Sequence, residues 1–225
     1  MIKALFVRTA VQTGGIALIL FGSAGTPHWP GAWLFLGTSV LLGIGGGLWL
    51  AQHHPDLLAE RLKPLMQKQQ PRADKIFIVA LWATAVVWLI VMGLDAVRYQ
   101  TSHIPAWVQM IGFMLMLLAF GGAFSVMLEN TFAAPVIKVQ QERGHHVVTT
   151  GLYAYVRHPM YAAIIPFFVG LPLLLGSWWG LAFAPLFIAL FAIRAVIEER
   201  TLLPSLKGYR DYVARVRYRL IPGIW

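Results

Sequence analysis

The chain has no cysteine and little charge for its length. The absence of cysteine excludes disulfide bonds, thiolate metal sites and a cysteine nucleophile. Charged residues make up only 12% of the 225 residues, whereas hydrophobic residues make up 58%. A soluble domain could not keep such a composition in water, so we expect the lipid bilayer to be the solvent of most of this chain.

Apolar segments recur along the whole sequence. A helix needs roughly 17 to 25 apolar residues to cross a bilayer, and six segments reach or approach that length. We place these segments near residues 4–22, 31–51, 76–96, 104–128, 161–175 and 178–196. The first segment also has the basic start and small residues of a cleavable signal peptide, but its removal would leave an odd number of spans. The sequence therefore predicts an all-α fold, a polytopic transmembrane bundle.

Acidic residues are also few, with 9 Asp and Glu against 18 Lys and Arg. Nucleic-acid binders carry excess positive charge on a folded soluble face, whereas here the charge lies between apolar segments, so we expect no nucleic-acid partner. If six segments cross and the N-terminus is inside, every Lys and Arg except Arg98 falls on the cytoplasmic side. This asymmetry predicts that both termini are cytoplasmic, in the inner membrane of a prokaryotic cell or the endoplasmic reticulum of a eukaryotic one.

The first half, residues 1–128, is typical of a scaffold. Gly43 and Gly47 share one face of the second segment and favour close helix contact, within the chain or between two copies. Residues 53–65 carry leucines on one side, which is consistent with a helix on the membrane surface or with a solvated connector.

The second half, residues 129–225, differs in composition. The loop 129–160 is long and polar, but it contains Val147, Val148, Tyr153, Tyr155 and Val156, which a disordered linker would not use. The last two segments are separated only by residues 176–177, so we expect a tight helical hairpin. A short helix with internal prolines at membrane depth needs protein or a cavity to cover its freed backbone groups. We therefore expect a pocket near this hairpin.

Ionisable residues gather at both ends of the predicted hairpin. Arg157, His158 and Tyr161 stand at its start, and Arg194, Glu198 and Glu199 stand near its end. Simple alternatives are that Arg194 pairs with Glu198 one helical turn away, and that Arg157 reaches to lipid headgroups. Because the hairpin returns both ends to one face, we expect these groups to meet, and ionisable groups at the hydrocarbon edge indicate a functional site.

Neighbouring histidines occur twice, at 53–54 and at 145–146. Adjacent residues are poorly placed to bind one ion together, and no carboxylate–histidine spacing accompanies these pairs. We therefore expect no metal.

An ordered set of motifs runs through the second half: VTTGLYAYVRHPMY at 148–161, EERTLL at 198–203, a Tyr-x-x-Tyr at 209–212 and IPGIW at 221–225. Together they resemble the isoprenylcysteine carboxyl methyltransferase family, which is related to the membrane phospholipid methyltransferases. The resemblance covers residues 129–225 and, more loosely, LLAER at 57–61.

The resemblance implies that S-adenosylmethionine binds in a cytosolic pocket closed by the loop, the hairpin and the C-terminal tail. Arg194 would lie on the substrate side, with Arg157 beside it as a second catalytic residue. The implied cofactor-binding residues are Gln140, His145, His146, Val147, Val148, Tyr153, His158, Pro159, Met160, Tyr161, Glu198 and Glu199.

The resemblance also implies a lipophilic or amphipathic acceptor that enters from the membrane lipids, by family default a carboxylate of the isoprenylcysteine type. A carboxylate would need a cation to position it but no general base. An alternative is an NADPH-dependent reductase, because membrane sterol reductases share an Arg-His-Pro-x-Tyr element and the basic tail could hold a 2′-phosphate. A transporter is also possible, but we find no internal repeat and no polar groups near the midplane.

Overall fold

A computed structural model describes residues 1–68 and 70–225. Within these residues the backbone is helical apart from turns, loops and one isolated bridge between Val156 and Tyr218. The elements are α1 (Ile2–Ala24), α2 (Pro30–His53), α3 (Pro55–Leu62), α4 (Arg72–Gly93), η1 (Leu94–Arg98), α5 (Ala106–Glu129), η2 (Gln141–Arg143), η3 (Gly151–Ala154), α6 (Pro159–Leu175), α7 (Trp178–Leu181), α8 (Ala184–Ser205) and α9 (Tyr209–Arg215).

The six predicted apolar segments are all helical. Five helical stretches of the described chain are long and apolar enough to cross a membrane: α1, α2, α4 with η1, α5, and α7 with α8. The sixth, α6, has 17 residues and would span roughly 26 Å. The predicted polytopic all-α bundle is confirmed, and the chain is an integral membrane protein.

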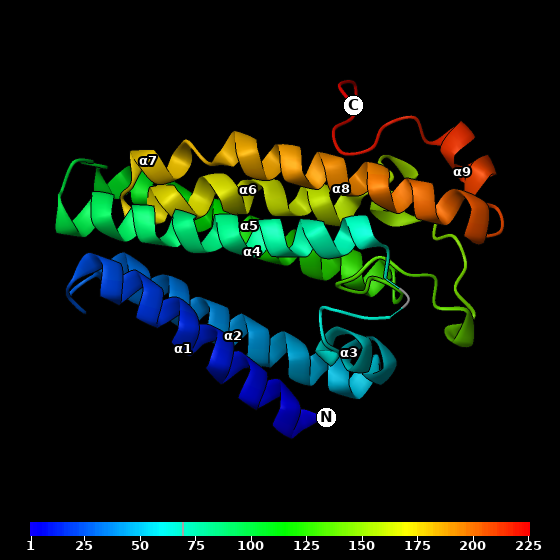
Figure 1. Ribbon diagram of the computed structural model, residues 1–225, viewed down its shortest axis with the longest axis horizontal. Coiled ribbons are helices and arrows are strands. Elements are labelled where there is room, and N and C mark those ends of the chain that lie inside the picture. The colour runs from blue at the N-terminus through cyan, green and yellow to red at the C-terminus, as the bar shows by residue number, and fades with distance from the viewer. Residues whose placement is uncertain (69) are drawn as a thin grey trace.

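The helices form two groups (Figure 1). α5 packs along α6, and α8 lies against both α4 and α6, while α1 and α2 form a tilted hairpin that contacts α4. α3, α9 and the loop before α6 gather at one end of the molecule. The core is rich in aromatic rings, and the Phe168 and Phe187 rings stack with centroids 4.4 Å apart beside buried Trp88.

Small residues allow the closest helix contacts. A Cβ atom on Gly112 of α5 would lie 2.6 Å from the carbonyl oxygen of Gly170 in α6, and one on Gly170 would lie 2.6 Å from that of Gly112. Backbone therefore meets backbone along α5 and α6. In α2 the predicted close contact is confirmed for Gly47, which packs against Leu5 of α1, whereas Gly43 faces open space.

The predicted hairpin of the last two segments is present. α6 ends at Gly176, whose φ of 85° lies in the left-handed region that favours glycine. Ser177 then caps α7, because its hydroxyl accepts a hydrogen bond from the Gly180 amide at 2.8 Å. The same hydroxyl donates to buried Asp95 at 2.5 Å, which ties the turn to η1, directly after α4. The hairpin thus returns α8 to the end of the molecule where α6 began.

The segment between α2 and α4 holds a short helix rather than a solvated connector. Leu57 and Leu58 of α3 are buried against Leu5 and Leu50. α3 is thereby fixed to the ends of α1 and α2. Arg61 follows the two buried leucines by one helical turn.

Candidate functional site

A cavity lies where α3, the loop before α6, α8 and α9 meet. Its interior measures about 110 Å³ within an open-mouthed hollow of about 820 Å³. The predicted site residues that line it are His145, His146, Val147, Val148, Tyr153, Arg157, His158, Met160, Tyr161 and Glu198. The other predicted residues, Gln140, Pro159, Arg194 and Glu199, lie outside this lining and support the groups that form it.

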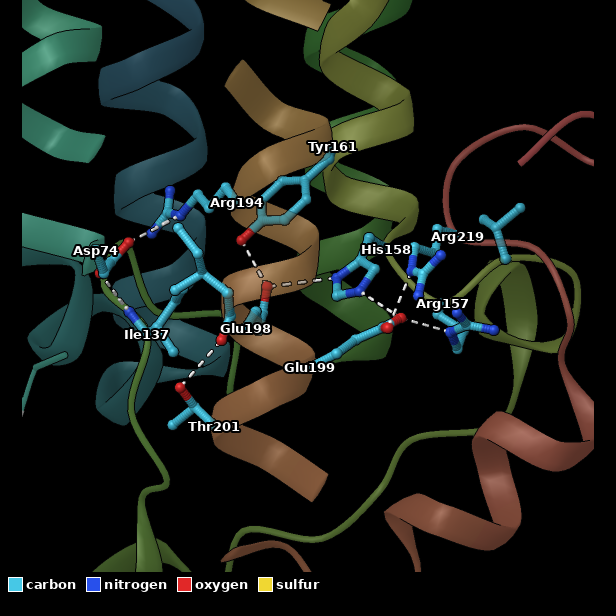
Figure 2. A network of polar contacts seen from close by, with 12 residues as sticks. Asp74, Ile137, Arg157, His158, Tyr161, Arg194, Glu198, Glu199, Thr201 and Arg219 are labelled. Carbon is cyan, nitrogen blue, oxygen red and sulfur yellow. Dashed lines mark hydrogen bonds and ion pairs between the residues drawn. The ribbon is translucent and has the colours of Figure 1, made fainter. Parts of the chain in front are cut away.

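The start of α6 and the end of α8 meet through His158, as Figure 2 shows. The imidazole Nδ1 lies 3.4 Å from a carboxylate oxygen of Glu198, and Nε2 lies 3.3 Å from one of Glu199. Burial alone would lower the pKa of His158, but the hydrogen bonds and charges of the two glutamates raise it above its usual value. The two glutamates therefore favour the protonated form of His158.

Tyr161 stands one helical turn beyond His158, and their rings stack with centroids 5.4 Å apart. The Tyr161 hydroxyl donates a hydrogen bond to Glu198 at 2.6 Å. The Glu198 side chain keeps 27% of its surface exposed. One face of this carboxylate is thus fixed by His158 and Tyr161 while the rest remains open to the cavity.

Glu199 joins the C-terminal tail to the site. Its carboxylate accepts hydrogen bonds from Arg157 at 2.6 Å and from Arg219 at 3.0 Å. Arg157 also donates to the carbonyl oxygens of Val216 and Arg217, at 2.7 and 2.8 Å. Arg157 is therefore buried between the loop and the tail, and the alternative that it reaches to lipid headgroups is wrong.

Arg194 has a partner that the sequence did not suggest. Its Nε lies 3.1 Å from a carboxylate oxygen of fully buried Asp74, and its Nη2 donates to the carbonyl of Pro135 at 2.6 Å. The guanidinium lies over the rings of Phe77 and Tyr161, 4.9 and 5.5 Å from their centroids. In the described structure Arg194 thus pairs with Asp74 of α4 instead of Glu198 and stands behind the cavity wall.

The segment between α5 and η2 forms one wall of the cavity and is held from several sides. The backbone amide of Ile137 donates to Asp74 at 3.0 Å, and Lys138 forms an ion pair with Glu60 of α3 at 2.5 Å. Gln140 is fully buried, and its amide donates to the carbonyl of Phe132 at 2.7 Å. Gln140 therefore shapes the wall rather than lining the cavity.

His145 faces the cavity as a neutral ring. Burial lowers its pKa to about 4. The Gln140 backbone amide lies 3.3 Å from Nδ1 and donates to it, which leaves the hydrogen on Nε2. The ring stacks on Phe132 with centroids 4.6 Å apart. His145 can thus offer one N–H donor at neutral pH without adding charge.

Two tyrosines of α9 complete the lining, and the sequence had marked them only as part of a motif. The Tyr212 hydroxyl donates to the carbonyl of Tyr153 at 2.8 Å, so α9 is fastened over η3. The Tyr209 hydroxyl is buried and has no hydrogen-bond partner among the described residues. Such a group is costly to bury alone, and it is available to a bound molecule.

Comparison with known proteins identifies this architecture. Residues 107–206 match the sequence model of a family described as phospholipid methyltransferase. No curated protein sequence matches the chain. The structure is similar to that of a eukaryotic intramembrane Ras methyltransferase, an isoprenylcysteine carboxyl methyltransferase, with a TM-score of 0.56 and 20% identity over 96% of this chain and 75% of that one.

The matched region and the cavity coincide. Only Arg61, Tyr209 and Tyr212 among the lining residues fall outside residues 107–206. The comparisons give no support to a reductase, and none of the basic residues of the tail beyond Leu206 lines the cavity as described. The family match over residues 107–206 and the shared fold together support a membrane methyltransferase.

Proposed function

We propose that this methyltransferase takes its methyl group from S-adenosylmethionine and transfers it to a lipophilic or amphipathic acceptor that reaches the cavity from the bilayer. The observation that carries the proposal is the open carboxylate of Glu198, held by His158 and Tyr161 beside the unpartnered hydroxyl of Tyr209. In this proposal residues 1–128 act mainly as scaffold and residues 129–225 carry the donor site.

The residues of the cavity fit the chemistry of the donor. S-adenosylmethionine has a sulfonium cation, an amino acid group, ribose hydroxyls and a flat base, and it supplies an electrophilic methyl group when bound. Glu198 can accept hydrogen bonds from an ammonium group or from hydroxyls, and Tyr153 and Tyr161 offer aromatic faces to a cation. The neutral His145 and the Tyr209 hydroxyl add neutral polar contacts. The adenine base of the donor is uncharged, so it needs no cation of the cavity beside it.

The chain's own part in the reaction is to align the two molecules and keep water out. An in-line displacement at carbon gains most from orientation and from a dry site. Tyr212 and Arg157 fasten the tail over the loop and thereby close the cavity on one side. We assign Arg157 and Arg194 to positioning, because Arg157 is committed to Glu199 and the tail while Arg194 fixes Tyr161 and the wall at Pro135.

The acceptor follows from the same chemistry. In this proposal Glu198 is committed to the donor, and Glu199 lies outside the lining and is paired with two arginines, so a neutral amine would have no free base to take its proton. A carboxylate acceptor, as in isoprenylcysteine, needs no base. We therefore favour an anionic oxygen as the nucleophile, on a substrate drawn from the lipid side.

The Glu198→Gln variant tests the donor site. The amide keeps the shape of the side chain but cannot attract a cation, so we expect affinity for S-adenosylmethionine to fall about tenfold or more. Glu142→Gln is the matched control, because Glu142 is exposed and lies outside the cavity lining. Calorimetric titration of each purified variant gives the affinities. Unchanged affinity for Glu198→Gln, or an equal loss in the control, would show that Glu198 does not hold the donor.

A further inference from the structure

Among residues 1–68 and 70–128, Arg61 is the one that lines the cavity. It lies near the end of α3, one turn after the leucines that fasten this helix to α1 and α2. Its Nη1 donates to the carbonyl of Ala133 at 3.0 Å, and the residue lines the cavity. The guanidinium is thereby fixed at one edge while its other donors stay available.

The other cations of the cavity are already matched by acids. Lys138 pairs with Glu60 at 2.5 Å, Arg157 with Glu199 at 2.6 Å, and His158 lies between two glutamates. Among the ion pairs of residues 1–68 and 70–225, Arg61 forms none. It is therefore the cavity's uncompensated charge.

The part of the chain that the structure describes places no free acid beside Arg61. The neighbouring acid, Glu60, forms ion pairs with Lys63 and Lys138. Arg8 of α1 donates to the Arg61 carbonyl and adds positive charge nearby. Burial and Arg8 lower the pKa of Arg61 to about 10, which leaves the guanidinium protonated at neutral pH. A charge that is partly buried without a partner is costly, and an oxyanion would remove that cost.

We infer that Arg61 binds the oxyanion of the acceptor, a carboxylate or phosphate group at the head of an amphiphile. A guanidinium offers two parallel donors that match either group. α3 and α9 stand on opposite sides of this end of the molecule (Figure 1), so the acceptor's head would enter from the side of α1 and α2, away from the α9 tyrosines. The inference rests on the proposed methyl transfer only in naming this amphiphile the acceptor.

The test measures binding of three probes to purified protein in a non-ionic detergent. The probes are N-acetyl-S-farnesylcysteine, its neutral carboxamide and a short-chain phosphatidylglycerol. For Arg61→Gln we expect at least one anionic probe to bind about tenfold more weakly, while the carboxamide binds as it does to the wild type. Arg61→Lys keeps the positive charge but loses the paired donors of the guanidinium. Its affinity for the anionic probes should therefore fall between those of the wild type and Arg61→Gln. S-adenosylhomocysteine should bind the wild type and Arg61→Gln equally.

Lys63→Gln is the matched control, because it removes the same charge from the next turn of chain without touching the cavity lining. A loss with the carboxylate alone identifies a carboxylate head, and a loss with the phospholipid alone identifies a phosphate. The inference is overturned if neither anionic probe binds the wild type, if Arg61→Gln weakens the carboxamide equally, or if Lys63→Gln has the same effect. If the anionic probes depend on Arg61 but S-adenosylhomocysteine does not bind, the oxyanion site stands and the methyl-transfer proposal fails.

Discussion

At the scale of single residues, the groups around His158 show how charge is kept in this site. Two adjacent glutamates of α8 face different partners: Glu198 faces Tyr161 and the cavity, and Glu199 faces Arg157 and Arg219. Neighbouring helical positions point about 100° apart, so one pair of acids can serve both a ligand and the tail. The sequence treated the two as one cofactor-binding pair, whereas the structure separates their surroundings.

From the sequence we could predict contacts only between residues that one helical hairpin connects. Arg157, His158, Tyr161 and Glu198 meet because α6 and α8 are the two long arms of that hairpin. Asp74 was missed because it lies before the apolar part of its helix, where an acid is expected to be solvated. Arg219 was missed because no local pattern indicates how far a tail folds back. Both partners come from segments distant in the chain, and only tertiary structure selects them.

The lowered pKa of His145 predicts how the stability of the fold depends on pH. Its pKa is about 4 in the fold against 6.5 for a solvated histidine, so the unfolded chain takes up this proton first as the pH falls. The stabilisation from neutral His145 is therefore complete above pH 6.5 and is lost between pH 6.5 and 4. NMR of histidine-labelled protein, with His145→Gln for assignment, should find a midpoint near 4. A midpoint near 6.5 would contradict the buried neutral ring.

At the scale of elements, the apolar segments predicted the number and order of helices well, because each must satisfy its backbone hydrogen bonds within the bilayer. The pairing of helices was harder to predict. Gly43 and Gly47 stood out by their spacing, but Gly112 and Gly170, where backbone meets backbone, lie on different helices. The spacing of glycines within one helix indicates a face of small residues, but it does not indicate which other helix packs against that face.

Gly112→Ala tests the contact between α5 and α6. The new methyl group would meet backbone atoms of Gly170 and Leu174 that cannot move aside, so we expect a loss of about 1–3 kcal/mol in stability. Gly121→Ala in the same helix is the control, because a methyl there meets nothing within 4 Å. Thermal unfolding in detergent should separate the two variants. Equal melting temperatures would contradict the backbone contact.

At the scale of the whole molecule, the basic residues that predict orientation fall into two groups, those outside the cavity and those that line it. Lys3 and Arg72 lie at helix ends outside the cavity lining, whereas Arg61 and Arg157 form part of it. The end of the molecule that carries α3, α9 and the cavity is the basic end, and we propose that it faces the cytoplasm. A soluble donor and a membrane-bound acceptor would then meet at one surface.

The absence of cysteine makes this orientation testable without a background of native thiols. His103, between η1 and α5, and Lys207, between α8 and α9, are both exposed, and Figure 1 shows these two connections at opposite ends of the molecule. His103→Cys and Lys207→Cys are therefore matched reporters. In intact cells an impermeant maleimide should label only the first variant, and it should label both after permeabilisation. Labelling of Lys207→Cys alone in intact cells would reverse the proposed orientation.

The most direct test of the central claim is calorimetric titration of the purified wild-type protein with S-adenosylhomocysteine and, separately, with NADPH. A cavity that offers a donor the Glu198 carboxylate, neutral His145 and the Tyr209 hydroxyl should bind the first at a single site. It should not bind the second, because the basic tail lies outside the lining. Binding of NADPH without binding of S-adenosylhomocysteine would contradict the proposed methyl donor.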